Sequence, residues 1–254
     1  MELQAAPAGA PLEHARLIPH AAARMSRVHL DILREAPPVI VPSLLLCDFG
    51  NLEREVRSVE EAGARCLHLD IMDGVFVPNI TYGMTIVSAV RRLTSLPLDV
   101  HMMISRPGDF VDAMIEAGAD LLTIHAEAVE DPRPLLERIR ESDAGAGIAI
   151  NPGTPLDAIH DCLPYCDMVL PMSVEPGFGA QQFESVALDK LRELKRRVEK
   201  TTLLEIDGGV NSSTVCQCAA AGAQMLVVGS AIFRNPESSY RQTIAELTHQ
   251  AATA

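Results

Sequence analysis

The stretch EAGARCLHLDI, residues 61–71, decides the fold because it joins the end of one element to the start of the next. Its Gly63 stands where a helix can close with a left-handed residue, and an apolar run follows at once. The same phrase recurs as EAGAD at 116–120 and as AAGAQ at 220–224, each time before another apolar run. The recurrence indicates a repeated unit in which a helix leads directly into a strand.

The unit repeats along the chain from residue 38. The expected strands are 39–46, 65–71, 97–103, 120–125, 146–151, 167–172, 202–206 and 224–228. Segments with helical spacing follow them at 51–63, 84–93, 108–117, 132–142, 155–160, 184–199, 211–221 and 236–251. These strand–helix units with short turns predict an α/β fold, a single closed (β/α)8 TIM barrel. An open, doubly wound sheet is the weaker alternative.

The length of 254 residues is about that of a single such barrel. We expect one TIM-barrel domain over 38–254, preceded by a partly disordered extension over 1–37 with a short helix near 26–35. The extension lacks the apolar core of a secretory signal, and the chain has no run of 18 apolar residues that would predict a membrane helix. A single non-membrane domain is therefore expected.

The charge balance limits the partners. The chain has 34 acidic and 21 basic residues, a formal net charge of −13. We expect neither nucleic acid nor an anionic membrane as a partner, because both select basic surfaces. A phosphorylated small molecule stays open, because backbone amides at helix N-termini can bind phosphate. Six cysteines without a CxxC pair predict that most are buried thiols in a reducing compartment, so we expect a cytoplasmic protein.

Polar residues gather where the expected strands end. In a parallel barrel these ends form one face, which carries the functional site. The candidates are Ser43, Asp48, His68, Asp70, Asp73, His101, His125, Glu127, Asn151, Met172, Ser173, Glu175, Asp207, Gly229 and Ser230. One buried histidine or aspartate is usually a satisfied core residue, whereas a set from several strands predicts a site.

Two histidines and two aspartates in this set predict a metal centre. His68 and Asp70 are two residues apart in a strand, so both side chains face the barrel interior. His101 and Asp207 can meet them from the third and seventh strands. This ligand set suits Zn²⁺, Fe²⁺ or Mn²⁺, and a divalent cation offsets the cost of burying two carboxylates. The alternative is a hydrogen-bonded polar cluster. Asp73 has the opposite parity, so we expect it to stabilise a loop.

Glycine-bearing turns follow the last three strands, at 175–183, 207–211 and 228–233. TIM barrels often hold phosphate with the loops after strands 7 and 8. The expected phosphate contacts are Gly208, Gly209, Gly229 and Ser230. The loop at 175–183 is long enough to close over a substrate as a lid.

These motifs, taken in order, resemble the ribulose-phosphate 3-epimerase family. They are VPSLLLCDF, HLDIMDGVFVPNITYG, DVHMMI, IHAE, NPGTP, MSVEPGFGAQQF, IDGGV and VVGSAIF, and they cover about residues 39–234. The resemblance implies a metal-dependent isomerase that interconverts D-ribulose 5-phosphate and D-xylulose 5-phosphate. It also implies a homo-oligomer with a small phosphorylated ketose as substrate. The metal would be one divalent ion per subunit: Zn²⁺, Fe²⁺ or Mn²⁺, with Co²⁺ as a further option.

Carried over by motif, the resemblance assigns roles to single residues. The implied metal ligands are His68, Asp70, His101 and Asp207, and the implied acid/base pair is Asp70 and Asp207. The implied substrate contacts are Ser43, His101, Met72, Met103, Met172, Gly177, Phe178, Gly179, Asp207, Gly208, Gly209, Gly229 and Ser230. Two carboxylates can remove the proton at C3 and return one to the opposite face through an enediolate.

Three features depart from the family pattern. Leu46 and Cys47 replace a small and polar pair, Ala180 replaces a glycine, and the extension over 1–37 lies outside the pattern. Because Leu46 and Ala180 could alter the pocket, one alternative is a 3-epimerase of a hexulose 6-phosphate such as D-allulose 6-phosphate. An alternative of another class is a non-catalytic barrel that binds sugar phosphate.

Overall fold

The computed structural model describes residue 27 and residues 30–34 and 38–254. Most of the extension over 1–37 lies outside the described residues. The expectation of partial disorder concerns those same residues. The described residues of the extension form a short helix, α1 (Leu30–Arg34), within the stretch near 26–35 where the sequence predicts a helix.

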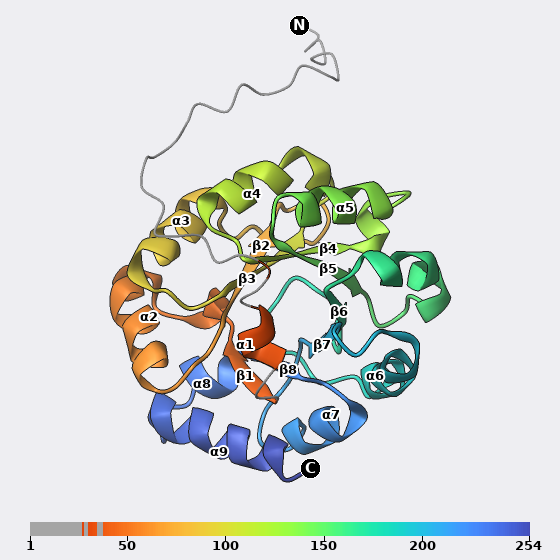
Figure 1. Cartoon of the computed structure of the whole chain (residues 1–254). Coiled ribbons are helices and arrows are strands. Elements are labelled where there is room, and N and C mark those ends of the chain that lie inside the picture. The colour runs from red at the N-terminus through yellow and green to blue at the C-terminus, as the bar shows by residue number, and fades with distance from the viewer. Residues whose placement is uncertain (1–26, 28–29, 35–37) are drawn as a thin grey trace, which may run out of the picture.

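Parallel strands form the centre of the molecule (Figure 1). They are β1 (Val39–Pro42), β2 (Leu67–Met72), β3 (Leu98–Met103), β4 (Leu121–His125), β5 (Gly145–Ile150), β6 (Met168–Pro171), β7 (Leu203–Ile206) and β8 (Met225–Val228). They pair in the order β1-β8-β7-β6-β5-β4-β3-β2, and a parallel bridge between Ser43 and His68 joins β1 to β2. This ring confirms the predicted TIM barrel and rules out the open sheet.

Helices surround the strands (Figure 1). The α-helices after α1 are α2 (Leu52–Glu61), α3 (Met84–Leu93), α4 (Val111–Ala117), α5 (Arg133–Glu141), α6 (Val186–Arg197), α7 (Val215–Ala221), α8 (Ser230–Phe233) and α9 (Tyr240–Ala252). The 3-10 helices are η2 (Leu44–Leu46), η3 (Phe49–Asn51), η4 (Pro107–Asp109), η5 (Ala126–Ala128) and η6 (Leu156–Tyr165). In α2, Val56 and Val59 are buried against the barrel and Arg57 is exposed, as the helical spacing predicts.

The repeated glycine phrase ends helices as predicted. Gly118 after α4 and Gly222 after α7 have φ angles of 116° and 118°, a conformation that residues with side chains rarely adopt. The N–H of Gly118 donates to the carbonyl of Ile115 and closes the last turn of α4. β4 and β8 then begin at Leu121 and Met225.

The first strand is shorter than the sequence predicts. It ends at Pro42 instead of residue 46, and η2 follows. Pro42 has no N–H for a ladder hydrogen bond, and the hydroxyl of Ser43 accepts the N–H of Leu45, which favours a tight turn. Likewise, η6 takes the place of the α-helix expected at 155–160.

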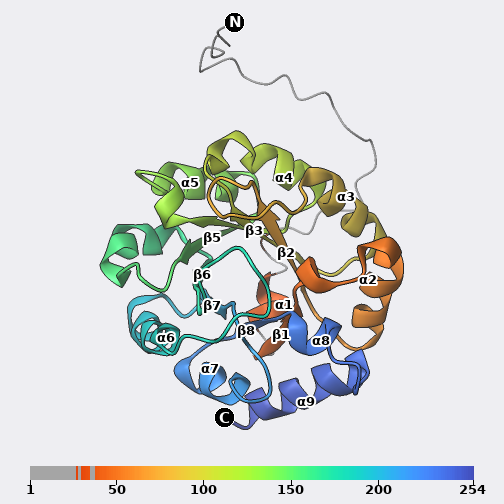
Figure 2. The same cartoon turned by 180° about the vertical axis from the view of Figure 1, so that it is seen from behind.

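The barrel interior is apolar where the strands begin. Its cluster includes Val39, Cys66, Leu121, Met168, Leu203 and Met225. Helix α1 lies across this end in Figure 1 and adds Leu30 and Leu33, which are 2% and 0% exposed. The opposite end, seen in Figure 2, is crossed by the loop that follows β6. One end of the barrel is therefore sealed by α1, and the other faces a long loop.

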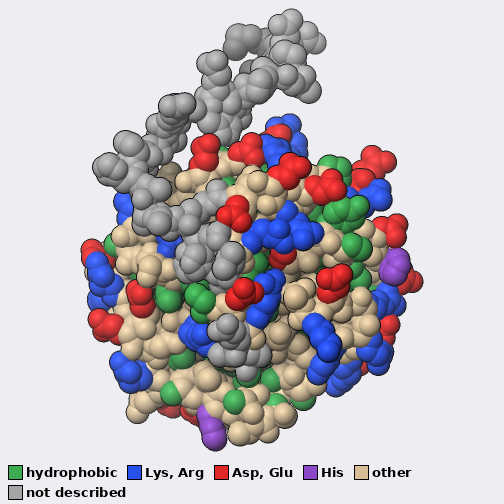
Figure 3. Space-filling model, viewed as in Figure 1, with side chains coloured by type: hydrophobic (Ala, Val, Ile, Leu, Met, Phe, Trp, Pro, Cys, Tyr) green, Lys and Arg blue, Asp and Glu red, His purple; other side chains and the backbone are tan. Residues whose placement is uncertain are grey.

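The surface at the end covered by α1 carries basic and acidic side chains close together (Figure 3). Among the described side chains visible on this face, no continuous basic area of the kind that nucleic acid binds is seen. Among the described residues, no helix is both long enough and apolar enough to cross a membrane.

Candidate active site

Four side chains meet where the strands finish. They are His68 and Asp70 of β2, His101 of β3, and Asp207, which follows β7. His68 Nε2 lies 3.3 Å and His101 Nδ1 lies 3.4 Å from Asp70 Oδ1. Asp207 Oδ2 lies 4.0 Å from His68 Nε2 and 3.9 Å from His101 Nδ1. The structure thus brings the four predicted metal ligands together, with one ligand atom of each within 4.8 Å of the others.

Strand pairing explains this meeting. β2 and β3 run parallel in a register that sets Asp70 opposite His101. His68 lies two residues before Asp70 and therefore faces the same interior. A parallel bridge between Met172 and Asp207 holds the end of β7 beside β6.

The cluster has the chemistry of a cation site. His68 Nε2 and His101 Nδ1 are buried and have no hydrogen-bond partner among the described residues. Buried polar atoms usually have a partner, and both nitrogens lie beside carboxylate oxygens. Two imidazole nitrogens and two carboxylate oxygens match the ligand preference of Zn²⁺, Fe²⁺ and Mn²⁺. The residues therefore fit a divalent metal.

Burial and charge shift the titration of the cluster. Burial alone would lower the pKa of His68, but the carboxylates of Asp99 and Asp70 outweigh it and raise that pKa well above its ordinary value. Burial would raise the pKa of Asp70, but His68 and His101 lower it. Burial and the charge of Asp70 raise the pKa of Asp207 to about 7. The two carboxylates therefore differ in proton affinity within one cluster.

A second polar layer lies beneath the cluster. His68 Nδ1 lies 2.5 Å from Asp99 Oδ2 and 3.8 Å from Glu205 Oε1, and both acids are 0% exposed. Burial and the charge of Asp99 raise the pKa of Glu205 well above its usual range. Neither acid is among the residues predicted from the sequence. Their signal is parity: Asp99 is two residues before His101, and Glu205 is two residues before Asp207.

His101 has a partner on the side away from the cluster. Its Nε2 lies 2.8 Å from His125 Nε2, and His125 Nδ1 lies 3.2 Å from Glu127 Oε2. Burial lowers the pKa of His125 to about 4. Burial would raise the pKa of Glu127, but hydrogen bonds from His125, Thr154 and Asn151 lower it to about 2. The sequence placed His125 and Glu127 at a strand end without a role, and the structure links them to His101.

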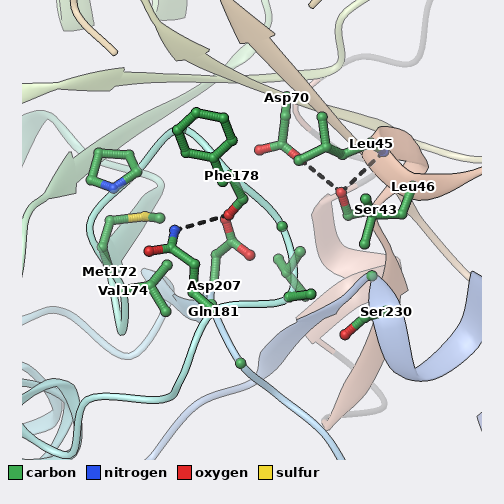
Figure 4. Close-up of a pocket in the computed structure, with 18 of the residues that line it drawn as sticks. Ser43, Leu45, Leu46, Asp70, Met172, Val174, Phe178, Gln181, Asp207 and Ser230 are labelled. Carbon is green, nitrogen blue, oxygen red and sulfur yellow. Dashed lines mark hydrogen bonds between the residues drawn. The ribbon is translucent and has the colours of Figure 1, made fainter. Parts of the chain in front are cut away.

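A pocket lies at the cluster and is lined by two of the four predicted ligands, Asp70 and Asp207 (Figure 4). Its lining includes the predicted residues Ser43, Asp70, Met72, Met103, Met172, Gly177, Phe178, Gly179, Asp207, Gly208, Gly209, Gly229 and Ser230. His101, also predicted as a substrate contact, is absent from the lining, and like His68 it is 0% exposed. The pocket is also lined by Leu45, Val174 and Gln181, which are not among the residues predicted from the sequence.

Serine and methionine side chains surround Asp70. The Ser43 hydroxyl donates to Asp70 Oδ2 at 2.6 Å, a bond drawn in Figure 4. Met72 and Met103 pack together with Val77 next to the pocket. Figure 4 shows Ser43 and Asp70 on one side of the pocket and Met172 on the other. Asp70 is therefore oriented by the Ser43 hydroxyl at a pocket whose walls carry both polar and apolar side chains.

The loop at 175–183 covers one side of the pocket. Gln181 Nε2 donates to the carbonyl of Phe178 at 2.9 Å, which holds the loop on itself (Figure 4). A Cβ added to Gly209, whose φ is 63°, would lie 2.8 Å from the backbone nitrogen of Phe183. Only glycine allows the turn after β7 to approach the loop this closely.

Two of the residues that depart from the family pattern, Leu46 and Ala180, line the pocket. Leu46 packs on the loop at Gly179, where an added Cβ would lie 2.9 Å from the leucine side chain. Ala180 has a φ of 60°, a left-handed conformation that favours glycine. Both substitutions therefore affect how the loop sits over the pocket.

Asp73 lies outside the cluster, as its parity predicts. Its Oδ1 accepts the N–H groups of Val75 and Phe76, both at 2.8 Å. Its Oδ2 accepts the N–H and the hydroxyl of Ser105 at 2.7 and 2.8 Å. Burial would raise the pKa of Asp73, but these bonds lower it to about 2. Asp73 thus joins the loop after β2 to the loop after β3.

Known proteins with similar sequences share one description. The model of the ribulose-phosphate 3-epimerase family matches residues 39–233. The ribulose-phosphate 3-epimerase of Bacillus subtilis is 44% identical over 212 residues, which cover 82% of this chain and 97% of that enzyme. The enzyme of the same name from Synechocystis is also 44% identical, over 82% of this chain and 91% of its own length.

Solved structures with a similar fold are more distant in sequence. A mutant tryptophan synthase alpha-subunit from Pyrococcus furiosus has a TM-score of 0.62 at 20% identity, over 85% of this chain and 96% of that chain. Thiamine phosphate pyrophosphorylase from the same organism has a TM-score of 0.62 at 19% identity, over 87% and 98% of the two chains. These similarities show the fold alone. The family match and the curated relatives show more: this chain belongs to the ribulose-phosphate 3-epimerase family.

Proposed function

We propose that this chain is an isomerase that interconverts D-ribulose 5-phosphate and D-xylulose 5-phosphate by epimerisation at C3. The observation that carries the proposal is the position of Asp70 and Asp207 in one cation-type cluster at a glycine-lined pocket. The name shared by relatives at 44% identity supports the same reaction.

The acid/base pair follows from the chemistry. Epimerisation removes the C3 proton, which is α to the C2 carbonyl, and returns a proton to the opposite face of the enediolate. We assign both transfers to Asp70 and Asp207, with the roles exchanged when the reaction runs in the other direction. The hydrogen bond from Ser43 to Asp70 Oδ2 orients one of the two carboxylates. Met72, Met103 and Met172 cap the site without offering protons.

We also propose one divalent metal per subunit, Zn²⁺, Fe²⁺, Mn²⁺ or Co²⁺. The proposed ligands are His68, Asp70, His101 and Asp207. When bound, the metal acts as a Lewis acid toward the negative charge that develops on substrate oxygens. The two buried imidazole nitrogens without partners support this assignment.

The phosphate group is assigned to the turns after β7 and β8. The proposed contacts are Gly208, Gly209, Gly229 and Ser230, with Gly177, Phe178 and Gly179 in the closing loop. No Lys or Arg is among the described residues that line the pocket, so backbone N–H groups are the expected anion ligands. In α8 the N–H groups of Ile232 and Phe233 already donate to the carbonyl of Gly229, so the expected anion donors there are the N–H groups of Ser230 and Ala231.

The wider context of the protein is also a proposal. The division into an extension over 1–37 and a catalytic barrel over 38–254 is supported by a family match that begins at residue 39. A homo-oligomer is supported by Val75 and Ile80, which are 75% and 76% exposed on the loop between β2 and α3. A cytoplasmic location is supported by six free cysteines.

The test is an assay of the purified, metal-stripped protein on D-ribulose 5-phosphate. We expect D-xylulose 5-phosphate to form after Fe²⁺, Mn²⁺, Zn²⁺ or Co²⁺ is added, with solvent deuterium incorporated at C3. A metal at 100 times its dissociation constant should also stabilise the fold by about 2.7 kcal/mol.

Three results would count against the proposal. Absence of product with every metal would refute it. A higher kcat/KM on D-allulose 6-phosphate than on D-ribulose 5-phosphate would move the activity to the hexulose substrate. Binding of sugar phosphate without deuterium exchange at C3 would indicate a non-catalytic barrel.

A further inference from the structure

A short chain of hydrogen bonds leads away from His101 on the side opposite the ligand cluster. His125 Nε2 lies 2.8 Å from His101 Nε2, and His125 Nδ1 lies 3.2 Å from Glu127 Oε2. His125 is 0% exposed, and the ring of Phe76 packs 4.8 Å from its ring. Protein groups therefore decide where the ring protons of these two histidines lie.

The outer end of the chain is anchored to the fold. Glu127 Oε1 accepts the N–H of Asn151 at 2.7 Å and the hydroxyl of Thr154. Lys190 of α6 holds the same loop, because its Nζ donates to the carbonyls of Asn151, Pro152 and Thr154 at 2.7, 2.8 and 2.7 Å. These contacts orient the carboxylate so that Oε2 faces His125.

The anchored carboxylate sets the direction of each bond. Glu127 has no proton to donate, so His125 Nδ1 must carry a proton toward Oε2. The other nitrogen of a neutral imidazole is an acceptor, so His125 Nε2 accepts from His101 Nε2. His101 Nδ1 is then left with its lone pair toward the carboxylate cluster.

We propose that His125 and Glu127 are positioning residues that fix the tautomer of His101, so that its Nδ1 lone pair serves as a metal ligand. This inference rests on the metal site of the proposed function. The tautomer of His68 is fixed more directly, because the Asp99 carboxylate contacts its Nδ1 and leaves Nε2 for the metal. The tautomer of each proposed histidine ligand is therefore fixed by a carboxylate, directly for His68 and through a second imidazole for His101.

Glu127→Gln tests the direction of the chain with little change in size. The N–H of Asn151 can only donate, so it keeps the glutamine oxygen on its side and turns the amide NH₂ toward His125 Nδ1. Both bonds then reverse, and the proton of His101 moves to Nδ1. We expect Zn²⁺ binding to weaken about 10- to 100-fold in competition titrations of the metal-stripped protein. In ¹⁵N NMR spectra of that protein, His101 should change from the Nε2–H to the Nδ1–H form.

Two variants separate this effect from loss of charge or of packing. Glu130→Gln removes the same charge three residues away at an exposed position, and Zn²⁺ affinity should stay within about twofold. His125→Phe breaks the chain but keeps a ring against Phe76. In that background, Glu127→Gln should cause no further loss of affinity.

The outcomes are distinguishable. Unchanged Zn²⁺ affinity and an unchanged His101 tautomer in Glu127→Gln would overturn the inference. A full additional loss in the His125→Phe background would also overturn it, because the effect would then bypass His125. Failure of the unaltered protein to bind any divalent metal would instead count against the proposed function.

Discussion

The barrel interior has a lower end, where the strands begin, and an upper end, where they finish, and the two differ in kind. The lower end holds an apolar cluster that includes Met168 and Leu203 and is closed by Leu33 of α1. The upper end holds two imidazoles and two carboxylates above the buried Asp99 and Glu205. Apolar burial stabilises by about 1.5–3 kcal/mol per large side chain, whereas buried like charges oppose folding unless a cation joins them.

Stability and chemistry are therefore separated along the barrel axis. A change at the upper end should reduce reactivity with little loss of stability. A change at the lower end should do the reverse. Substitutions at the two ends therefore test this separation.

The largest effect is expected from Asp207→Asn. Loss of a group assigned to proton transfer should reduce turnover about 10²- to 10⁴-fold. At pH values below 7, the substitution should not decrease the free energy of unfolding of the metal-free protein. Asp207 has a pKa of about 7 and is therefore largely neutral there, and asparagine resembles this neutral form. Steady-state turnover with metal and thermal unfolding without it measure the two quantities.

The matched control for this variant is Asp161→Asn, a change at an exposed position on η6. It should leave turnover and unfolding close to those of the unaltered protein. Near-normal turnover in Asp207→Asn would refute the acid/base assignment. A loss of stability as large as that of a core truncation would refute the separation of the two ends.

The next effect is expected at the lower end, from Leu33→Ala. This side chain is 0% exposed, so the truncation should reduce the free energy of unfolding by about 2–5 kcal/mol. Turnover per folded molecule should not change, because the lower end takes no part in the chemistry. Ile32→Ala on the same helix, at a side chain that is 39% exposed, should change stability by about 0.5 kcal/mol or less. Equal stability of the two variants would show that α1 does not seal the barrel.

Repetition made most of the fold predictable from the sequence. The helix expected at 84–93 is α3, with the same bounds. Alternation in 65–71 also placed His68 and Asp70 on one interior face, because side chains two residues apart in a strand point the same way. Local periodicity was sufficient for these positions, but it did not predict that β1 ends at Pro42 or that η6 is a 3-10 helix.

Relations between elements were not predictable in the same way. Asp99 stands opposite His68 in the register of β2 and β3, and that register depends on how the whole barrel closes. Parity marks Asp99 and Glu205 as interior residues but does not make them neighbours. Helix α1 could be expected as a helix, but five residues carry too little periodicity to show that Leu33 seals the barrel.

The smallest effect is expected from Asp73→Asn, which tests whether every carboxylate at the upper end opposes folding. Asp73 has its own donors, the N–H groups of Val75, Phe76 and Ser105, so its charge should stabilise the fold. The amide can accept at only one atom, and partial exposure weakens the bonds, so we expect a loss of about 1–2 kcal/mol.

The pH dependence of this loss gives the sign of the charge effect. Burial would raise the pKa of Asp73, but the donated hydrogen bonds lower it from 3.8 to about 2. A lowered carboxyl pKa stabilises the folded state above the unfolded pKa, and that stabilisation disappears as pH falls through the folded pKa. Denaturant titrations should therefore show a constant difference between Asp73→Asn and the unaltered protein above about pH 4 and a shrinking one toward pH 2. A difference that grows at low pH would mean that the folded state disfavours the charged form of Asp73, as it does that of Asp207. The hydrogen bonds donated to Asp73 would then not distinguish the two acids.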